Sequence, residues 1–316
     1  FCAGLDKRID DIVATWALEA GMPHGNGLAL TTDASVFWHR ALDEALTAPW
    51  VEVRDTPMGK VEVRHEPVGP VVGVVAFNGP HMQFALAMIP ALLAGNTVII
   101  KLAPESRMLG YLFAAAAAEA DFPAGVLSIL AGDADVSQYL VEHDDVAAVH
   151  FTGGTEVGRA VMHACADRVA NVVLELGGKS AAIVAADADL EATVPALVDA
   201  MALYSGQICL TMTRLVVARE IHDQVVAGLV AGLKALKVGD PTDPETTWGP
   251  LAAPRFLERA EGYIHRAVAE GATVAYGGRR PAGLDGYFLE PTLLTNVTRD
   301  MEVAQQEIFG PVLGVL

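Results

Sequence analysis

Hydrophobic runs alternate with helical stretches through residues 70–177, and this alternation predicts a parallel α/β sheet. The runs that predict buried strands are residues 71–77, 97–102, 126–130, 147–151 and 172–176. Between them, apolar residues at helical spacing predict helices over residues 82–94, 107–120 and 155–165. Apolar strands that alternate with helices indicate a parallel sheet with both faces covered, and ligands bind such sheets beyond the carboxyl ends of the strands.

A second α/β pattern begins after Gly178. It predicts strands at residues 181–184, 215–218, 273–276 and 288–294, and helices at residues 190–204, 222–236 and 254–270. Before residue 50, the pattern predicts a helix over residues 6–19, stopped by Gly21 and the glycines at 25 and 27. A second helix is predicted over residues 33–46, with Asp33 as its N-cap.

Residues 51–54 and 61–64 alternate between valine and charged side chains, with a Pro- and Gly-containing turn between them. This period of two predicts an amphipathic β-hairpin. Two interpretations stay open for it: an ordinary surface hairpin, or an arm whose exposed edge pairs with a neighbouring subunit.

Composition narrows the classes of function. The chain is 52% hydrophobic with mean hydropathy +0.36, so it can build a large core. Its net charge of −18 argues against a nucleic-acid or anionic-membrane partner. Three cysteines, no run of membrane-spanning length and no visible signal peptide favour a cytoplasmic protein. A start at Phe1 and a stop within a strand-like run at Leu316 suggest a fragment, or numbering from the first ordered residue.

The residues 205–210 place one thiol, Cys209, between a glycine-containing loop and an apolar segment. A thiol becomes a nucleophile as the thiolate, and its free pKa of about 8.5 means that it needs an activating partner. Glu175, at the end of a predicted strand and before two glycines, is the candidate partner and a candidate base for water. The alternative for Glu175 is a solvated strand-end carboxylate. Cys2 and Cys165 have no comparable setting.

Other polar residues end neighbouring predicted strands. Asn78 is either a turn asparagine or an amide donor to a developing oxyanion. Lys101 is either solvated or a ligand of ribose hydroxyls or phosphate. The glycine-containing turn at residues 151–158 opens a helix, where a backbone can approach a phosphate. The nine histidines show no metal-ligand spacing, so we expect no metal site.

Taken together, six ordered motifs resemble the NAD(P)-dependent aldehyde dehydrogenase superfamily, of the hydrolytic, non-acylating type. The motifs are residues 77–80, 90–97 leading to Lys101, 151–158, 175–179, 206–209 with Arg214, and 307–312. The resemblance spans nearly the whole chain. It implies that Cys209 is the nucleophile that forms a thiohemiacetal and then a thioester, that Glu175 activates the hydrolytic water, and that Asn78 with the Cys209 backbone N–H forms the oxyanion hole.

The same resemblance implies NAD as the cofactor, with NADP possible. It assigns Lys101 and Glu307 to the two riboses and Phe309 to the nicotinamide. The full set of cofactor-binding residues is Lys101, Glu105, Gly153, Gly154, Thr155, Gly158, Leu176, Glu307 and Phe309. The family's acidic residue three places after the ribose lysine is replaced here by Pro104, with Glu105 next, which leaves NADP use open.

The implied fold is a Rossmann-like parallel-sheet cofactor domain plus a second α/β catalytic domain, with a protruding β-hairpin oligomerisation arm. We expect residues 1–46 and 68–177 to form the dinucleotide-binding domain, residues 47–67 the hairpin, and residues 178–316 the catalytic domain. The expected partners are a small-molecule aldehyde and further copies of the chain in a homodimer or homotetramer. Relatives are expected to extend beyond both ends of this chain.

Differences from the family motif bear on the substrate. The family often has Trp-Asn-Phe where this chain has residues 77–79, and Leu86 and Ala87 replace a frequent aromatic residue and lysine. A wider aldehyde tunnel and a substrate bulkier than acetaldehyde are therefore expected. Two alternatives stay open: an acylating, coenzyme A-dependent semialdehyde dehydrogenase, which Glu175 disfavours, and an inactive homologue or fragment.

Overall fold

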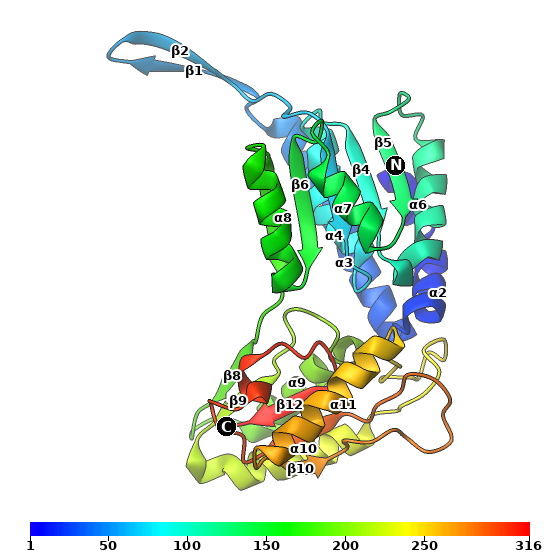
Figure 1. Ribbon diagram of the computed structural model, residues 1–316, viewed down its shortest axis with the longest axis vertical. Helices are drawn as coiled ribbons and strands as arrows, with labels where there is room; N and C mark the ends of the chain where they lie inside the picture. Colours follow the sequence, from blue (N-terminus) through cyan, green and yellow to red (C-terminus); the bar gives the residue numbers. More distant parts are fainter. The chain divides into compact units, whose positions relative to one another are not determined.

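The computed structural model describes residues 1–316, which separate into two compact units. Unit 1 consists of Phe1–Ile12 and Leu28–Leu176, and unit 2 consists of Val13–Gly27 and Gly177–Leu316. Each unit has its own five-stranded sheet, and a two-stranded hairpin belongs to unit 1 (Figure 1). The predicted α/β class is therefore confirmed.

The sheet of unit 1 is entirely parallel, with the strand order β5-β4-β3-β6-β7. Its strands are β3 (Val71–Val75), β4 (Val98–Leu102), β5 (Leu127–Ala131), β6 (Ala148–Gly153) and β7 (Asn171–Leu176). The central strand β3 is buried along its whole length, as expected for a strand covered on both faces. The chain runs outward from β3 in both directions, so the strand order reverses there. Such a reversal is where ligands bind in open α/β sheets.

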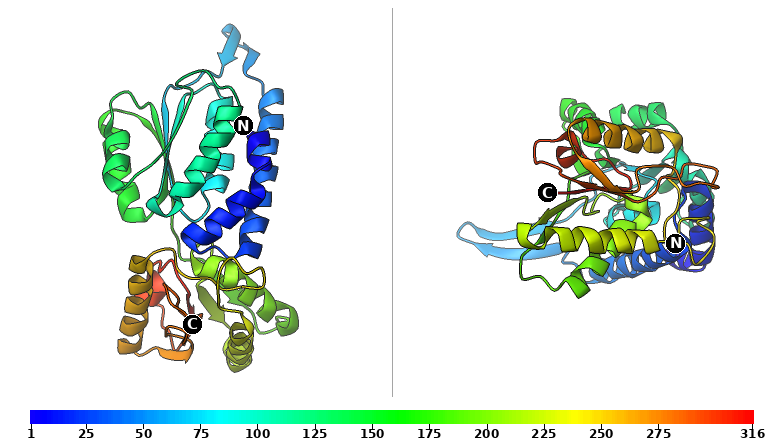
Figure 2. Two further views of the ribbon diagram at one scale, coloured as in Figure 1. Left: turned by 90° about the vertical axis from the view of Figure 1, so that its right-hand side faces the viewer. Right: turned by 90° about the horizontal axis from the view of Figure 1, so that it is seen from below.

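Helices cover both faces of this sheet (Figure 2). Helices α7 (Ala134–Glu142) and α8 (Thr155–Asp167) pack with β3 and β6 around one hydrophobic cluster. Helix α6 (Arg107–Glu119) packs against β5 and against α1 (Cys2–Asp6). The segment predicted as one helix over residues 82–94 is α4 (Pro80–Gln83), a π-helical turn (Phe84–Met88) and α5 (Ile89–Leu93).

The prediction that the glycines at 25 and 27 stop a helix, and that the next helix begins at Asp33, was wrong. Helix α2 (Ile9–Ala20) ends before Gly21 as predicted, but α3 (His24–Thr47) begins nine residues before Asp33. Gly25 and Gly27 lie inside α3, and a side chain on Gly27 would come within 3.2 Å of Met22. Close packing at Gly27 thus outweighs the low helix propensity of glycine. Helix α7, with Asp133 at its N-cap position, was not predicted.

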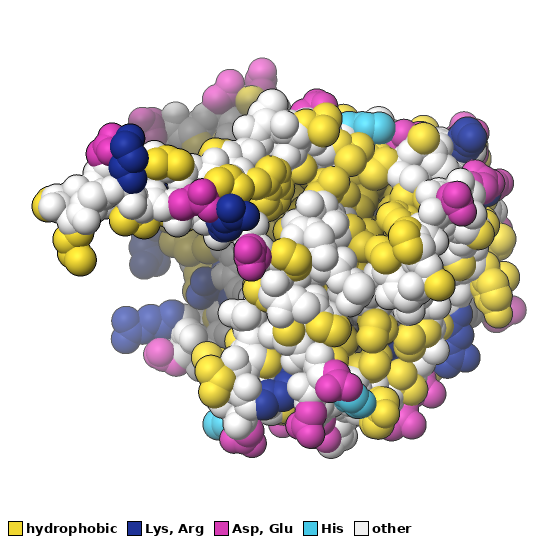
Figure 3. Space-filling view, turned by 90° about the horizontal axis from the view of Figure 1, so that it is seen from above, with side chains coloured by type: hydrophobic (Ala, Val, Ile, Leu, Met, Phe, Trp, Pro, Cys, Tyr) yellow, Lys and Arg dark blue, Asp and Glu magenta, His cyan; other side chains and the backbone are white.

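The hairpin consists of β1 (Val51–Thr56) and β2 (Gly59–Arg64), paired in antiparallel register from Val51 with Arg64 to Thr56 with Gly59. Nearly all of its residues are exposed. Figure 3 shows hydrophobic side chains on it beside charged ones; Val51, Val53, Met58 and Val61 are among the exposed hydrophobic residues. A two-stranded ribbon buries too little to be stable without support from neighbouring structure.

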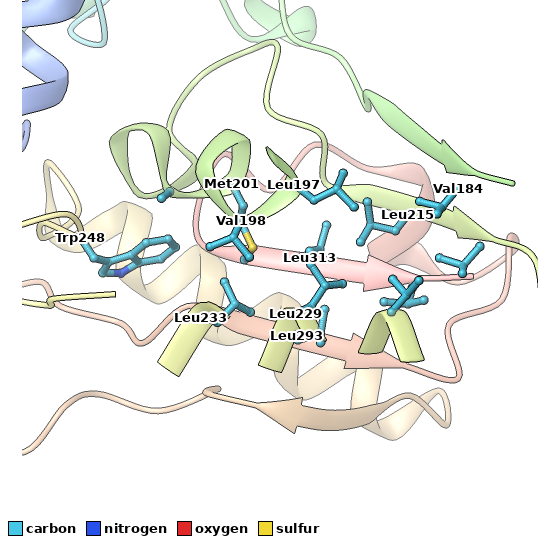
Figure 4. Close-up of a cluster of buried hydrophobic side chains, with 14 residues drawn as sticks. Val184, Leu197, Val198, Met201, Leu215, Leu229, Leu233, Trp248, Leu293 and Leu313 are labelled. Atoms are coloured by element: carbon cyan, nitrogen blue, oxygen red, sulfur yellow. The ribbon is translucent and has the colours of Figure 1, made fainter. Parts of the chain in front are cut away.

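Unit 2 contains a mixed sheet of order β10-β11-β12-β9-β8, in which only β10 is antiparallel to its neighbour. The strands are β8 (Ala181–Val184), β9 (Arg214–Val217), β10 (Thr273–Tyr276), β11 (Thr292–Thr295) and β12 (Val312–Val315). Helices α9 (Leu190–Ala202) and α10 (His222–Ala235) pack on one face, where Trp248 closes the cluster drawn in Figure 4. Helices α11 (Pro254–Ala269) and α12 (Glu302–Gln305) belong to a second cluster.

Residues Val13–Gly27 group with unit 2 rather than with the first domain, where the sequence analysis placed them. The reason is side-chain packing: the rings of Trp16 and Tyr204 lie 5.6 Å apart, and the Tyr204 hydroxyl donates to the Ala20 carbonyl at 2.8 Å. None of the helices has both the length and the apolar composition needed to cross a bilayer.

Candidate active site

Asn78 follows the central strand β3 of unit 1 by three residues and is half-buried. The turn that carries it is held by Gln83, which was not predicted as a functional residue. Gln83 Oε1 accepts from the Ala76 N–H at 2.9 Å, and Gln83 Nε2 donates to the Ala76 carbonyl at 3.3 Å. This paired amide contact fixes the backbone leading into Asn78, and no sequence motif marks it.

Lys101 lies next to the last residue of β4 and is only 5% exposed. Its ammonium group forms no hydrogen bond or ion pair within the protein. Burial lowers the pKa of Lys101, and the nearby charges of Asp133, Glu105 and Asp135 oppose that shift. A buried cation without a direct partner at the carboxyl edge of a parallel sheet is suited to hydroxyl or phosphate ligands.

The turn between β6 and α8 carries Gly153, Gly154 and Thr155. Gly154 is the N-cap of α8 and makes no side-chain cap, so the first N–H groups of the helix stay open to an anion. Gly158 has a packing role, since a Cβ there would lie 2.5 Å from Leu176 on β7. This is how the third glycine of a dinucleotide fingerprint brings helix and strand together, although the spacing here differs.

Glu175 is the penultimate residue of β7, an edge strand, and its side chain is exposed. It pairs in register with Thr152 on β6. The hydroxyl of Thr152 is buried without a hydrogen-bond partner. Burial lowers the pKa of His150, which lies on the same strand as Thr152, and the Glu175 charge opposes that shift. The carboxylate is therefore exposed, next to a half-buried histidine on the neighbouring strand.

In unit 2, Cys209 follows a strained turn and is the one exposed cysteine of three. Tyr204 and Ser205 both have φ of +50°, a left-handed conformation that non-glycine residues rarely adopt. Gly206 continues the turn at φ +78°, and a Cβ there would lie 2.5 Å from the Gly310 carbonyl. Consecutive strained residues persist only when surrounding contacts hold them, and they cluster at active sites.

Three side chains hold this turn, and none of them was predicted as functional. The Ser205 hydroxyl donates to the Gly249 carbonyl at 2.9 Å. Gln207 Oε1 accepts from the Ala252 N–H at 3.0 Å, and Gln207 Nε2 donates to the Tyr204 carbonyl at 3.3 Å. Tyr204 is the third, through its contact with Ala20. The only sequence signal was the run Tyr-Ser-Gly-Gln at residues 204–207, which ends two residues before Cys209.

Glu307 and Phe309 lie in the segment that contacts this turn through Gly310. Glu307 Oε1 accepts from the Gly178 N–H at 3.3 Å, and the Arg259 guanidinium donates to the Glu307 carbonyl. Burial raises the pKa of Glu307. Phe309 has φ of +59°, and its ring centroid lies 6.4 Å from that of Phe256.

Lys179 is a second buried cation, and its Nζ has no hydrogen-bond partner. Burial, together with the charge of Arg214, lowers its pKa to about 8. The Arg214 guanidinium donates to the backbone carbonyl of Lys179, which ties β9 to the segment after Gly178. Lys179 belongs to the motif at residues 175–179, and the sequence predicts no role for it.

The predicted residues thus fall into two groups. Unit 1 carries Asn78, Lys101, Glu105, Gly153, Gly154, Thr155, Gly158, Glu175 and Leu176. Unit 2 carries Cys209, Glu307 and Phe309. The unpaired Lys101, the uncapped start of α8 and the orphan hydroxyl of Thr152 fit the donors that a dinucleotide requires.

Comparison with known proteins places these features in a family. The model of the "Aldehyde dehydrogenase family" matches residues 1–316. Geranial dehydrogenase of Castellaniella defragrans is 35% identical across the whole chain, which covers 66% of that protein. The 3,6-anhydro-alpha-L-galactose dehydrogenase of Streptomyces coelicolor is also 35% identical, over 97% of this chain and 63% of the relative.

Solved structures agree with the sequence comparison. An aldehyde dehydrogenase of Mycobacterium tuberculosis, complexed with NAD+, matches the whole chain with a TM-score of 0.94 and 36% identity. Betaine aldehyde dehydrogenase of Staphylococcus aureus, also in complex with NAD+, matches with a TM-score of 0.95 and 30% identity. The chain covers 66% and 63% of these two structures, so it spans about two thirds of the length of its relatives.

Proposed function

This chain belongs to the aldehyde dehydrogenase family, and from that premise we propose that the protein oxidises an aldehyde to a carboxylic acid with a nicotinamide dinucleotide. One observation carries the proposal: Cys209 is exposed on a turn that three side chains hold in a strained conformation, whereas Cys2 and Cys165 are buried. Burial raises the pKa of both other thiols, which suppresses their thiolates.

The chemistry proceeds in two halves. The Cys209 thiolate attacks the carbonyl carbon and forms a C–S bond, which gives a thiohemiacetal oxyanion. The Asn78 amide and the Cys209 backbone N–H stabilise that oxyanion. Collapse of the oxyanion releases a hydride, for which a nicotinamide cofactor, when bound, would supply the acceptor. A thioester remains on Cys209.

Glu175 completes the proposed reaction. Its carboxylate takes a proton from a water molecule, whose oxygen attacks the thioester carbon. The C–S bond breaks, the acid leaves and the thiolate is restored.

We infer the cofactor ligands from the family motifs, residue by residue. The uncapped start of α8, with Gly153, Gly154 and Thr155, receives the pyrophosphate. Lys101 and Glu307 bind the two riboses, and Phe309 packs beside the nicotinamide. Glu105, Gly158 and Leu176 shape the same site. Several relatives bind NAD+ in their solved structures, which supports NAD+ here.

The substrate is proposed to be bulkier than acetaldehyde. Leu86 and Ala87 lie on the π-helical turn that follows Asn78, and Leu86 is exposed. Neither residue carries the charge or aromatic ring that many family members have there. The named relatives are a geranial dehydrogenase, a 3,6-anhydro-alpha-L-galactose dehydrogenase and a betaine aldehyde dehydrogenase, so membership of the family does not determine which aldehyde is oxidised.

A direct assay tests the proposal. Purified protein is mixed with NAD+ and aldehydes of increasing chain length and with aromatic aldehydes, and absorbance at 340 nm reports reduced cofactor. We expect turnover that yields the free acid, that coenzyme A does not accelerate, and that favours the longer substrates. Cys209→Ala should abolish turnover, while Cys165→Ala should retain it.

The opposite results identify the alternatives. A product that appears only with coenzyme A would establish the acylating reaction. No turnover with any aldehyde, together with iodoacetamide labelling of Cys209 no faster than of Cys165, would establish an inactive homologue. Similar rates across all chain lengths would exclude a preference for bulky aldehydes.

A further inference from the structure

The cofactor ribose site of unit 1 contains acidic side chains that the family comparison does not explain. The position where many relatives carry the acidic residue that disfavours NADP is Pro104 here. Pro104 cannot repel a phosphate. The structure, however, shows that three other carboxylates contribute to the electrostatic field at Lys101: Glu105, Asp133 and Asp135.

Strand register brings two of these carboxylates to Lys101. Lys101 pairs with Leu130, and Leu102 pairs with Ala131, across β4 and β5. The Gly132 N–H then donates to the Leu102 carbonyl at 3.4 Å. The chain therefore enters the α7 turn directly beside the end of β4. Asp133 and Asp135 lie in that turn, at the N-cap and in the first helical turn of α7.

Asp133 does not serve as a helix cap through its side chain. Its Oδ1 instead lies 3.5 Å from the Arg107 guanidinium at the start of α6. Arg107, Asp133 and Asp135 line one open hollow of about 590 Å³, together with Tyr111 and Gly132, and Lys101 is not among its lining residues. Arg107 is the one cation in that lining, and Asp133 pairs with it although both side chains are largely exposed.

The balance of charge is therefore unfavourable for a second phosphate. Lys101 and Arg107 supply two positive charges, and Glu105, Asp133 and Asp135 supply three negative charges. Lys101 is 5% exposed and has no direct partner, so it remains available to the hydroxyls of a ribose. A 2′-phosphate at the same ribose would meet the carboxylates and a guanidinium that is already paired.

We propose that Asp133 and Asp135 determine cofactor specificity in this protein, and that they select NAD+ by excluding the 2′-phosphate of NADP+. This proposal rests on the proposed function, because it takes Lys101 as a ribose ligand. Neutralising Asp133 also releases Arg107 to bind the phosphate. Asp133 thus acts twice, through repulsion and through competition for the guanidinium.

Isothermal titration calorimetry with the full chain measures the affinity for each cofactor, and it requires no turnover. NAD+ and NADP+ are titrated separately, followed by adenosine 5′-monophosphate and adenosine 2′,5′-bisphosphate as minimal probes. Wild type should bind NAD+ at least tenfold more tightly than NADP+. Asp133→Asn/Asp135→Asn should lower that ratio about tenfold or more, which is about 1.4 kcal/mol, mainly through tighter NADP+ binding.

Two further variants make the experiment specific. Asp144→Asn removes the same charge from an exposed residue just beyond the other end of α7, and it should leave the ratio unchanged. Adding Arg107→Ala to Asp133→Asn should remove most of the gain in NADP+ affinity. A thermal midpoint for each variant shows whether it is folded.

The outcomes separate this inference from the proposed function. Equal wild-type affinity for the two cofactors, or an unchanged ratio in the double variant, would overturn the role of Asp133 and Asp135. Binding of neither cofactor would overturn both proposals. Selective NAD+ binding without aldehyde oxidation would leave the specificity role intact and refute the proposed activity.

Discussion

At the scale of single residues, Glu175 and Cys209 divide the proposed reaction into two halves with different proton requirements. Glu175→Gln keeps the size of the side chain but removes the carboxylate that acts as the base. The variant should still release a stoichiometric burst of NADH when mixed with aldehyde and NAD+, because hydride transfer precedes water activation. Steady-state turnover should fall about 100-fold or more. Stopped-flow absorbance at 340 nm separates the two phases.

Glu191→Gln is the matched control, since Glu191 is an exposed residue in the first turn of α9. It should leave the burst and the steady-state rate close to those of wild type. Loss of the burst itself in Glu175→Gln would contradict the claim that Glu175 acts only after hydride transfer, because Glu175 would then be needed before the thioester forms.

Lys179 predicts a pH dependence of stability. Its pKa is lowered to about 8 in the folded protein, against about 10.4 when unfolded. At pH values between these two pKa values, the unfolded chain binds more protons than the folded chain does. The free energy of unfolding should therefore rise as the pH increases from about 8 to 10. Below pH 8 both states are protonated, and the folded state carries the full cost of the buried charge.

Lys179→Met should remove that cost, so the thermal midpoint of unit 2 at pH 7 should rise by about 2 °C or more. The difference from wild type should shrink as the pH rises toward 10. Scanning calorimetry at several pH values measures both effects, with the exposed Lys7→Met as control. A lower midpoint in Lys179→Met would show instead that attraction to Glu307 outweighs the burial cost.

At the scale of elements, the strained turn before Cys209 depends on a few side-chain contacts. Ser205→Ala removes the hydrogen bond to Gly249 and leaves a buried carbonyl without its partner. We expect a loss of about 1–3 kcal/mol in stability and a slower reaction of Cys209 with iodoacetamide. Ser128→Ala, at an exposed position on β5, should change neither. Unchanged Cys209 reactivity in Ser205→Ala would show that the turn does not position the thiol.

The sequence predicts most strands of both sheets well, because runs of apolar residues and their flanking turns are local features; the exception is β11, which begins at Thr292, four residues after its predicted start. It fails where a distant contact decides. Gly25 and Gly27 are read as helix stops because their low helix propensity is local, whereas the close approach of Gly27 to Val13 and Trp16 on α2 is not. The π-helical turn at Phe84–Met88 was not predicted either, and its last residue, Met88, packs so close to Gly73 that any Cβ there would clash.

At the candidate site, too, features that depend on contacts distant in sequence could not be predicted. Cys209, Glu175 and Lys101 could be named from their motifs. The left-handed conformations of Tyr204 and Ser205 could not, because neither residue type favours them and the supporting groups are more than 40 residues away in sequence. Asp133 and Asp135 were missed because helix α7 was missed, and with it the turn that brings them to Lys101.

At the scale of the whole molecule, the hairpin gives a prediction about assembly. We expect the purified chain to form dimers or tetramers, since the exposed edges of β1 and β2 can pair with another copy. Replacing residues 51–64 by a short Gly-Ser linker should shift the mass measured by light scattering toward the monomer. The thermal midpoint should stay within about 2 °C, because most of the hairpin is exposed. If the measured mass did not change, the hairpin would not be part of the interface between subunits.

Mass-spectrometric mapping of the acyl group tests the central claim most directly. Glu175→Gln is mixed with an aldehyde and NAD+, quenched in acid during the burst and digested, and every cysteine-containing peptide is weighed. The account predicts an acyl adduct on the Cys209 peptide, dependent on NAD+, with Cys2 and Cys165 unmodified. NADH formation without any adduct on Cys209, or with the adduct on another residue, would contradict it.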